Sequence, residues 1–298
     1  MKIGSEIRRH GADGPSPSKL VAVVVPLSAR PEFTADELIS LRHLTHYLGR
    51  HDRYMIAPRN GTSEYPGFTV LRFPNRFFGS PAAHDRLMLW PKFYETFRDY
   101  KYILCYHLDS LVFSDQLEQW CGMDWDYIGP PWLKCPELPW VDVERVGNIG
   151  FALLKVDSFL KVLYSPRYQT DPDEYWRRHY AGTPPRVRLV NLPKKYLKRL
   201  PVFNSVRWQM RRWLLAGQHS DTFWSDQAKK YNPEFRIADV GTSLRFAFEA
   251  APRICFERTN RTLPFGCHAW ARYDRAFWEP YLLPKRLACA PKTENALA

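Results

Sequence analysis

Short apolar runs and amphipathic stretches alternate along the first part of the chain. The apolar runs are rich in valine, isoleucine and aromatic residues, which is typical of strands buried on both faces of a parallel sheet. The first amphipathic stretch opens with a capping box, Thr34 and Glu37. The second contains Pro91, where we expect a kink. Strands alternating with helices predict an α/β fold, a single domain around a mostly parallel, doubly wound central sheet. The predicted strands cover residues 20–27, 54–58, 68–73 and 101–108, and the helices cover residues 34–48 (with Leu38, Leu41, Leu44 and Leu48 on one face) and 82–97.

The second half of the chain predicts shorter elements separated by glycine and proline. Ser114 is the expected N-cap of a short helix, and Asp157 caps another that follows an apolar strand. A later helix over residues 219–231 has Ser220 or Asp221 near its start. A strand and turn are expected at residues 124–132 and further strands at 235–238 and 243–249, and the segment 263–270 is expected to end the folded part.

Composition sets the scale of the domain. The chain has 298 residues, of which 45% are hydrophobic and 15% aromatic, enough for one large domain. We expect a disordered tail at 1–18, a domain at 19–288 and a loose tail at 289–298. No apolar run reaches the roughly 18–20 residues needed to span a bilayer, and the N-terminus lacks the apolar core of a secretory signal. Six cysteines without metal-binding spacing favour the cytoplasm.

Positive charge is concentrated in one segment. The formal net charge is +12, and residues 186–212 hold nine Lys and Arg but no Asp or Glu, with Trp, Tyr, Phe and Leu interleaved. This segment lies within a predicted basic helical insertion, residues 165–217. It is a candidate for contact with an anionic membrane, and a solvated basic insertion fits the pattern equally well. No helix-turn-helix, zinc finger or RNP pattern supports nucleic acid binding.

Asp109 interrupts two apolar runs, in the stretch YILCYHLDSLVF. A charge placed inside a core is costly unless it is paired, hydrogen-bonded or bound to a metal. In open α/β sheets, ligands bind beyond the carboxyl ends of the strands. Asp109 is therefore expected to hold a ligand; a turn-capping aspartate is the alternative interpretation.

The same stretch resembles a motif of the glycogenin-like glycosyltransferases, D-x-D-[ST]-L-V, which belong to the GT-A group of nucleotide-sugar-dependent enzymes. Asp109 matches the second aspartate, Ser110 to Val112 match the residues after it, and His107 stands where the first aspartate is expected. The segments WDYIGPPW, VGNIGFAL, DTFWS, LRFAFE and PFGCHAW resemble, in the same order, a family of bacterial and viral domains of unknown function grouped with those enzymes. The resemblance spans roughly residues 20–270 and implies a GT-A-like domain, with a nucleotide-binding half at about 19–130 and an acceptor half at about 131–288.

The resemblance also implies a divalent metal, Mn²⁺ or Mg²⁺. Asp109 and the late His268 are the expected ligands, and His107 is the third candidate. A metal ion can neutralise the diphosphate that leaves when a glycosyl bond breaks. Histidine ligands favour manganese. The alternative for His268 is a histidine packed among aromatic residues beside Trp270.

Other residues are assigned by their place in the resembled pattern. A carboxylate must deprotonate the acceptor hydroxyl of an inverting transferase; Asp221 is the first candidate and Asp226 the second, with helix capping the alternative for Asp221. The nucleotide-sugar candidates are Pro26, Arg30, Arg86, His107, Asp109 and Ser110, and the candidates for sugar or acceptor binding are Trp132, Gly147, Asn148, Gly150 and Trp224.

The leading hypothesis is a cytoplasmic, metal-assisted glycosyltransferase of polysaccharide biosynthesis. It would move a sugar from a nucleotide-sugar to a hydroxyl of a glycan or lipid-linked acceptor, with inversion, and residues 186–212 would hold it at the inner membrane face. A retaining outcome stays open because the glycogenin-like family retains. Two alternatives remain: a catalytically inactive nucleotide- or glycan-binding module, and a peripheral membrane- or polyanion-binding protein on an α/β scaffold.

Overall fold

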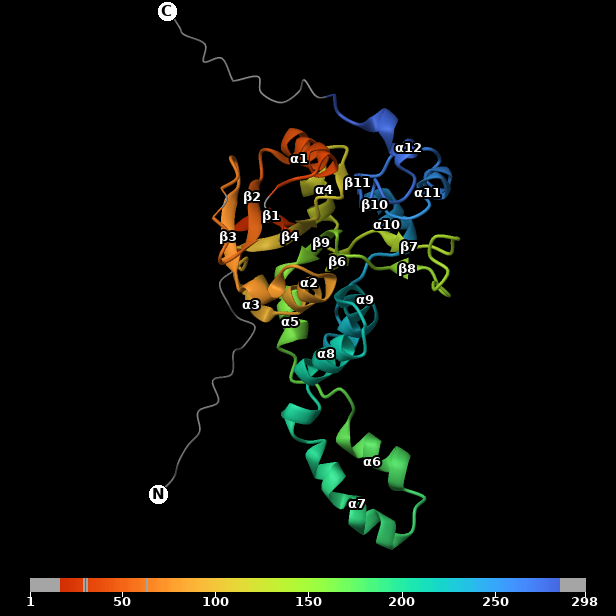
Figure 1. The fold of residues 1–298 in the computed structure, drawn as a ribbon. Coiled ribbons are helices and arrows are strands. Elements are labelled where there is room, and N and C mark those ends of the chain that lie inside the picture. The colour runs from red at the N-terminus through yellow and green to blue at the C-terminus, as the bar shows by residue number, and fades with distance from the viewer. Residues whose placement is uncertain (1–16, 29, 31, 63, 285–298) are drawn as a thin grey trace, which may run out of the picture.

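A computed structural model describes residues 17–28, 30, 32–62 and 64–284. Its centre is a six-stranded sheet in the order β3-β2-β1-β4-β9-β6 (Figure 1). The first four strands in sequence are parallel, and only β9 runs against its neighbours. The predicted α/β fold with a mostly parallel central sheet is confirmed. The strands are β1 (Lys19–Pro26), β2 (Asp52–Pro58), β3 (Thr69–Phe73), β4 (Tyr100–Tyr106), β6 (Tyr127–Ile128) and β9 (Phe151–Lys155).

The sheet is buried on both faces, as its apolar runs predict. Successive residues of β1 alternate between two hydrophobic clusters: Val24 belongs to one, and Val23 and Val25 to the other. Helices α1 and α4 cover one face, and α2, α3, α5 and α9 cover the other (Figure 1). These helices are α1 (Ala35–Leu48), α2 (Pro81–Met88), α3 (Pro91–Glu95), α4 (Leu117–Gly122), α5 (Val156–Leu163) and α9 (Ser220–Tyr231), and a 3-10 turn, η1 (Asn75–Phe77), precedes α2.

Helix α1 has the predicted capping box, and most of its predicted face is buried. Leu44 and Leu48 are fully buried and Leu41 packs against their cluster, whereas Leu38 is 50% exposed. The polar residues Ser40 and His43 are also fully buried, and the ring of His43 has a partner on each side: one nitrogen lies 2.9 Å from the carbonyl of Val112 and the other accepts the N–H of Leu283. Tertiary partners therefore extend the buried face of the helix beyond its leucines.

Three helix boundaries also differ from the prediction. Pro91 begins a new helix, α3, instead of kinking one helix, because proline suits the first helical position. Ser114 does not cap α4, which starts after Gln116 without a side-chain cap. Asp157 lies in the first turn of α5, one residue past its beginning.

Two predicted strands near the C-terminus are wrong in part. Residues expected as a strand at 243–246 belong to α10 (Val240–Phe246), whose N-cap Asp239 accepts a hydrogen bond from Thr242 N. Only β10 (Ala247–Phe248) is extended, and in the predicted strand 235–238 only Ile237 forms a bridge, to Tyr127. Local helix capping outweighed the β-propensity of this segment.

Small sheets and late helices complete the domain. One sheet joins β10, β11 (Gly266–Cys267) and β5 (Leu111–Val112), and the other joins β7 (Pro131–Trp132) and β8 (Arg145–Val146). The fold continues past the predicted end at residue 270: Trp278 is fully buried and stacks on Phe113 at a centroid distance of 5.3 Å. The late elements are α11 (Pro252–Arg258), α12 (Arg275–Trp278) and the 3-10 turn η3 (Glu279–Tyr281).

The predicted basic insertion is helical. Helices α6 (Pro172–Tyr180) and α7 (Pro185–Leu197) extend away from the sheet, whereas α8 (Val206–Leu215) packs against the domain with Val206 and Met210 buried (Figure 1). The 3-10 turn η2 (Pro201–Phe203) connects α7 to α8. Within the described part of the chain, no helix has both the length and the apolar character to cross a membrane. Most of the two predicted tails, residues 1–16 and 289–298, lies outside the described residues.

Candidate metal centre

The turn between β4 and β5 lies at the carboxyl edge of the parallel strands and carries His107 and Asp109. The backbone N–H of His107 donates to the carbonyl of Gly150 at 2.7 Å, and that of Ser110 donates to the carbonyl of His107 at 3.0 Å. Tyr106, the last residue of β4, donates its hydroxyl to the carbonyl of Ser110. These bonds fix the turn, so both side chains leave it in defined directions.

His268 reaches the same place from the far end of the sequence. It follows β11, which pairs antiparallel with β5, and the N–H of Trp270 donates to the carbonyl of Asp109. Gly150 makes room for the imidazole, because a β-carbon at that position would lie 2.1 Å from Nε2 of His268. Backbone pairing and a missing side chain thus bring His268 to Asp109.

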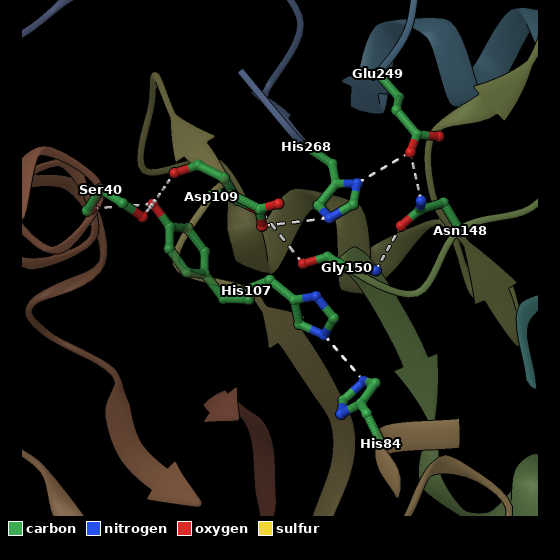
Figure 2. Close-up of polar contacts among 10 residues, drawn as sticks. Ser40, His84, His107, Asp109, Asn148, Gly150, Glu249 and His268 are labelled. Carbon is green, nitrogen blue, oxygen red and sulfur yellow. Dashed lines mark hydrogen bonds and ion pairs between the residues drawn. The ribbon is translucent and has the colours of Figure 1, made fainter. Parts of the chain in front are cut away.

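His107, Asp109 and His268 form a group of potential metal ligands (Figure 2). One ligand atom from each lies within 4.8 Å of the others. Nε2 of His268 is 3.3 Å from Oδ1 of Asp109, and the two histidine rings lie 5.6 Å apart between centroids. Two imidazoles and one carboxylate fit a transition metal such as manganese. Across the described ranges, no other group of three His, Cys, Asp or Glu side chains has this geometry.

The electrostatics suit a metal site. Burial and the nearby His84 and His268 hold the pKa of His107 well below its usual value, so its imidazole is neutral and has a free lone pair. Burial would raise the pKa of Asp109, but His268 outweighs this and lowers it, so Asp109 is a carboxylate. Burial would lower the pKa of His268, but Asp109 and Glu249 outweigh it and raise that pKa.

Glu249 is a residue that sequence reasoning missed. Its side chain is nearly buried, and Oε1 accepts from Asn148 Nδ2 at 2.5 Å and lies 3.1 Å from His268 Nδ1 (Figure 2). Oε2 is buried without a hydrogen-bond partner among the described residues. A carboxylate on the far nitrogen of a ligating histidine fixes the tautomer and orientation of the ring. The sequence does carry a signal for Glu249: this acid ends the apolar run LRFAFE, as Asp109 ends the apolar run YILCYHL.

His84 is a second residue that was missed. Its Nε2 lies 3.1 Å from Nε2 of His107, and burial lowers the pKa of His84 to about 4. A neutral pair of imidazoles can share one hydrogen bond, which holds the His107 ring in place. His84 lies in HDRLML, the segment from which only Arg86 was selected.

Asp221 lies at the start of α9 but does not cap it. The N-cap is His219, which makes no side-chain cap. Asp85 of α2 takes that role from 135 residues away, accepting from the N–H and the hydroxyl of Ser220 at 2.8 and 2.7 Å. Burial, Asp85 and Glu249 raise the pKa of Asp221 to about 7, against opposition from His268 and His219. The charges of Glu249 and His268 thus act on Asp221, whose carboxyl group can accept a proton near neutral pH.

Among the nucleotide-sugar candidates, Arg30 and Arg86 have partners outside this group, whereas Ser110 belongs to the turn that carries Asp109. Arg30 pairs with Glu37 at 2.7 Å, and Arg86 is exposed and donates to the carbonyl of Arg76. Pro26 is the last residue of β1, and Ser110 is buried with its hydroxyl donating to Gly150 O. The second base candidate, Asp226, is exposed and pairs with Arg145 at 3.2 Å.

The two tryptophans among the candidates for sugar or acceptor binding are packed in the interior. Trp224 is fully buried and donates its indole N–H to the carbonyl of Met88, so this prediction is wrong for the described structure. Trp132 is only 5% exposed, beside Trp140 and Arg145. Both tryptophans lie in or next to apolar elements, so hydrophobic packing buries their rings.

The turn at Gly147 and Asn148 supports the candidate metal centre through its packing and hydrogen bonds. A β-carbon at Gly147 would lie 2.4 Å from the ring of Trp132. Asn148 has a positive φ of 40° and is 8% exposed. Its amide donates to Glu249, and its oxygen accepts the N–H of Gly150 at 2.6 Å. Both polar ends of Asn148 are therefore engaged in holding the turn and Glu249.

A hollow of about 430 Å³ lies at the opposite, amino-terminal edge of the strands. Its charged side chains pair with each other, Lys19 with Asp52 and Arg50 with Glu118. These pairs engage its lysine, arginine and acidic side chains, whereas Nε2 of His51 in its lining is buried without a hydrogen-bond partner among the described residues.

Comparison with solved structures finds glycosyltransferases. The galactosyltransferase LgtC, solved with donor and acceptor sugar analogs, is 14% identical with a TM-score of 0.42, over 89% of this chain and 98% of that chain. The glycosyltransferase GlyE of Streptococcus pneumoniae TIGR4 is 12% identical with a TM-score of 0.41, over 89% of this chain but 61% of that chain. A glycosyltransferase involved in the glycosylation of the major capsid of PBCV-1 is 11% identical with a TM-score of 0.40, over 88% of this chain and 98% of that chain.

A comparison with curated proteins finds no match. One protein-family model does match, described as a protein of unknown function, DUF5672. It covers residues 67–268, more than half of the 298-residue chain, and includes His84, His107, Asp109, Asp221, Glu249 and His268. The chain therefore belongs to the DUF5672 family.

Proposed function

We propose that this protein is a metal-dependent glycosyltransferase that moves a sugar from a nucleotide-sugar to a hydroxyl of a glycan or lipid-linked acceptor. The observation that carries the proposal is the convergence of His107, Asp109 and His268 beyond the carboxyl ends of the parallel strands. That edge is where open α/β sheets bind ligands. The resemblance of HLDSLVF to the glycogenin-like motif implies a metal ligand at the same aspartate, Asp109.

The three side chains would hold Mn²⁺ or Mg²⁺, with the two imidazoles favouring manganese. When bound, such an ion supplies a Lewis acid for the departing diphosphate. His107 contributes a neutral imidazole held by His84, and Asp109 contributes the carboxylate charge. Glu249 and Asn148 orient His268 from behind.

Asp221 is our proposed base for the inverting reaction, and Asp226 is the second candidate. Asp221 would take the proton of the acceptor hydroxyl as that oxygen attacks the anomeric carbon. Its pKa of about 7 suits a group that must gain and lose a proton near neutral pH. Asp226 is exposed, and its carboxylate is engaged by Arg145 at 3.2 Å.

The proposal also includes contact between the basic segment and a membrane. The basic segment at residues 186–212 would hold the enzyme at the inner face of a membrane, near an acceptor carried by lipid.

The test is incubation with a panel of nucleotide-sugars and Mn²⁺, with release of free nucleotide as the measurement. We expect slow hydrolysis by the native protein and its loss in Asp109→Ala. Asp115→Ala is the matched control, because Asp115 is an exposed aspartate close by in the sequence.

Equal activity of Asp109→Ala and Asp115→Ala would show the metal assignment to be wrong. Metal-dependent nucleotide binding without turnover would favour an inactive binding module. Absence of both would rule out the transferase.

A further inference from the structure

Helices α6 and α7 form an arm, residues 171–203, that projects from the domain (Figure 1). Its base is closed by Asn204, which is fully buried. Asn204 donates to the carbonyl of Thr170 at 2.7 Å, and its side-chain oxygen accepts the N–H of Thr170 at 3.0 Å. The arm therefore leaves the domain from a fixed point.

The inner side of α7 faces α6 with charged contacts. Asp173 of α6 pairs with Lys195 at 2.9 Å and with Arg199 at 3.3 Å. Lys195 also lies 5.9 Å from the ring centre of Trp176. These contacts fix which side of α7 is turned inward.

The other side of α7 is apolar and uncovered. The apolar residues at positions 189, 190, 193, 196 and 197 follow the spacing of one helical face. Leu189 is 71% exposed, Val190 78% and Tyr196 57%, and none of the residues of α7 is buried. The following turn continues the pattern, with Val202 64% exposed. An apolar face of this extent in water marks an interaction surface.

The apolar face is bordered by unpaired positive charge. Arg186 and Lys194, which lie on or beside this face by helical spacing, form no ion pair with any residue in the described ranges. The sequence holds no acidic residue from Pro184 to Asn204. A partner of this surface must therefore be both negatively charged and able to cover apolar side chains.

We propose that the outer face of α7 docks on an anionic lipid bilayer, with the helix lying in the plane of the interface. A bilayer surface covers Leu189, Val190 and Tyr196 among acyl chains while its headgroups meet the bordering Arg and Lys. An anionic polymer would neutralise the charges but leave the apolar face in water. The inference deepens the membrane contact proposed above by naming the surface that makes it, and vesicle binding tests it separately from turnover.

Flotation of the full-length protein with phosphatidylcholine vesicles, with and without phosphatidylglycerol, tests the proposal. We expect binding only with phosphatidylglycerol. Each basic side chain at such a surface contributes roughly five-fold in affinity, so Arg186→Glu with Lys194→Glu should lower binding by about 10-fold or more. Leu189→Ser with Val190→Ser should lower it by about 10-fold through loss of apolar insertion.

The matched control is Lys229→Glu with Lys230→Glu, the same charge change at exposed positions of α9 on the domain, outside the basic segment. We expect this pair to bind nearly as the native protein does. Equal loss in the control would overturn the proposal, since net charge would then explain binding. Vesicle binding that survives Leu189→Ser with Val190→Ser would also overturn it, because an electrostatic polyanion site needs no apolar face. The substituted side chains are exposed, and unchanged melting temperatures would verify folding.

Discussion

The histidine at position 107 changes the charge of the candidate centre. Its imidazole is neutral, so the three candidate ligands would present one negative charge, from Asp109, once His268 has lost its proton to solvent on binding a metal. The resembled motif, with two aspartates, would present two. Fewer carboxylates weaken the attraction for a hard ion such as Mg²⁺, whereas imidazole suits manganese. We therefore expect the histidine at position 107 to shift the preference of the site from Mg²⁺ toward manganese.

Glu249→Gln tests the role of the buried carboxylate behind His268. The substitution keeps the size of the side chain but removes the charge that orients the ring. We expect Mn²⁺ affinity, measured by calorimetry, to fall by about 10- to 100-fold. Glu257→Gln is the control, since Glu257 is exposed and pairs with Arg261 one helical turn away. Native affinity in Glu249→Gln would show that the contact does not support the metal.

Asp221→Asn tests the titration of the proposed base. A native pKa of about 7, above the ordinary 3.8, means that the folded state binds more protons than the unfolded state between these values. The free energy of unfolding therefore falls as pH rises through this window. We expect Asp221→Asn to raise the melting temperature at pH values above about 7 and to have little effect near pH 4.

Turnover provides a second measurement on the same variant. Native activity should increase as pH rises through about 7, because the base must be deprotonated. Asp221→Asn should lose roughly 100- to 10,000-fold. If Asp226→Asn loses turnover instead, the second candidate is the base.

At the scale of elements, the centre depends on two turns packed against each other. Gly150, before β9, accepts from the turn after β4 and leaves space for the ring of His268. Helix α9 starts where Asp85 of α2 binds its first N–H, so the place of Asp221 depends on contact between two helices. Neither arrangement follows from the local sequence of a single element.

Gly150→Ala should displace His268. The added β-carbon would lie 2.1 Å from Nε2 of the imidazole, so the ring must move away from Asp109. We expect lower Mn²⁺ affinity and a loss of about 1–3 kcal/mol in the free energy of unfolding from overpacking. Gly182→Ala is the control, because nothing lies within 4 Å of a β-carbon there. Equal behaviour of the two variants in denaturant titration and metal binding would contradict the steric argument.

For the whole molecule, the arm is separable from the domain that carries the centre. Residues 170 and 204 are already held together by hydrogen bonds through Asn204. Replacing residues 171–203 with a short glycine-serine linker should therefore close the chain with little strain.

We expect Mn²⁺ affinity to be retained in this arm-deleted protein and its melting temperature to stay within about 4 °C of the native value. Calorimetry would check both quantities. Loss of cooperative unfolding would mean that the arm is required for the stability of the domain.

The local sequence determined the strands β1 to β4 and the capping box of α1, because short β-prone runs and a reciprocal N-cap have few other solutions. It also singled out Asp109, because a carboxylate at the end of an apolar run needs a partner. Tertiary structure decided the partner contacts. Glu249 and His84 reach the centre from positions remote in the chain, and contacts of this kind depend on how distant segments pack. For the same reason, only packing could show that Trp224 is interior and that the apolar face of α7 has no cover.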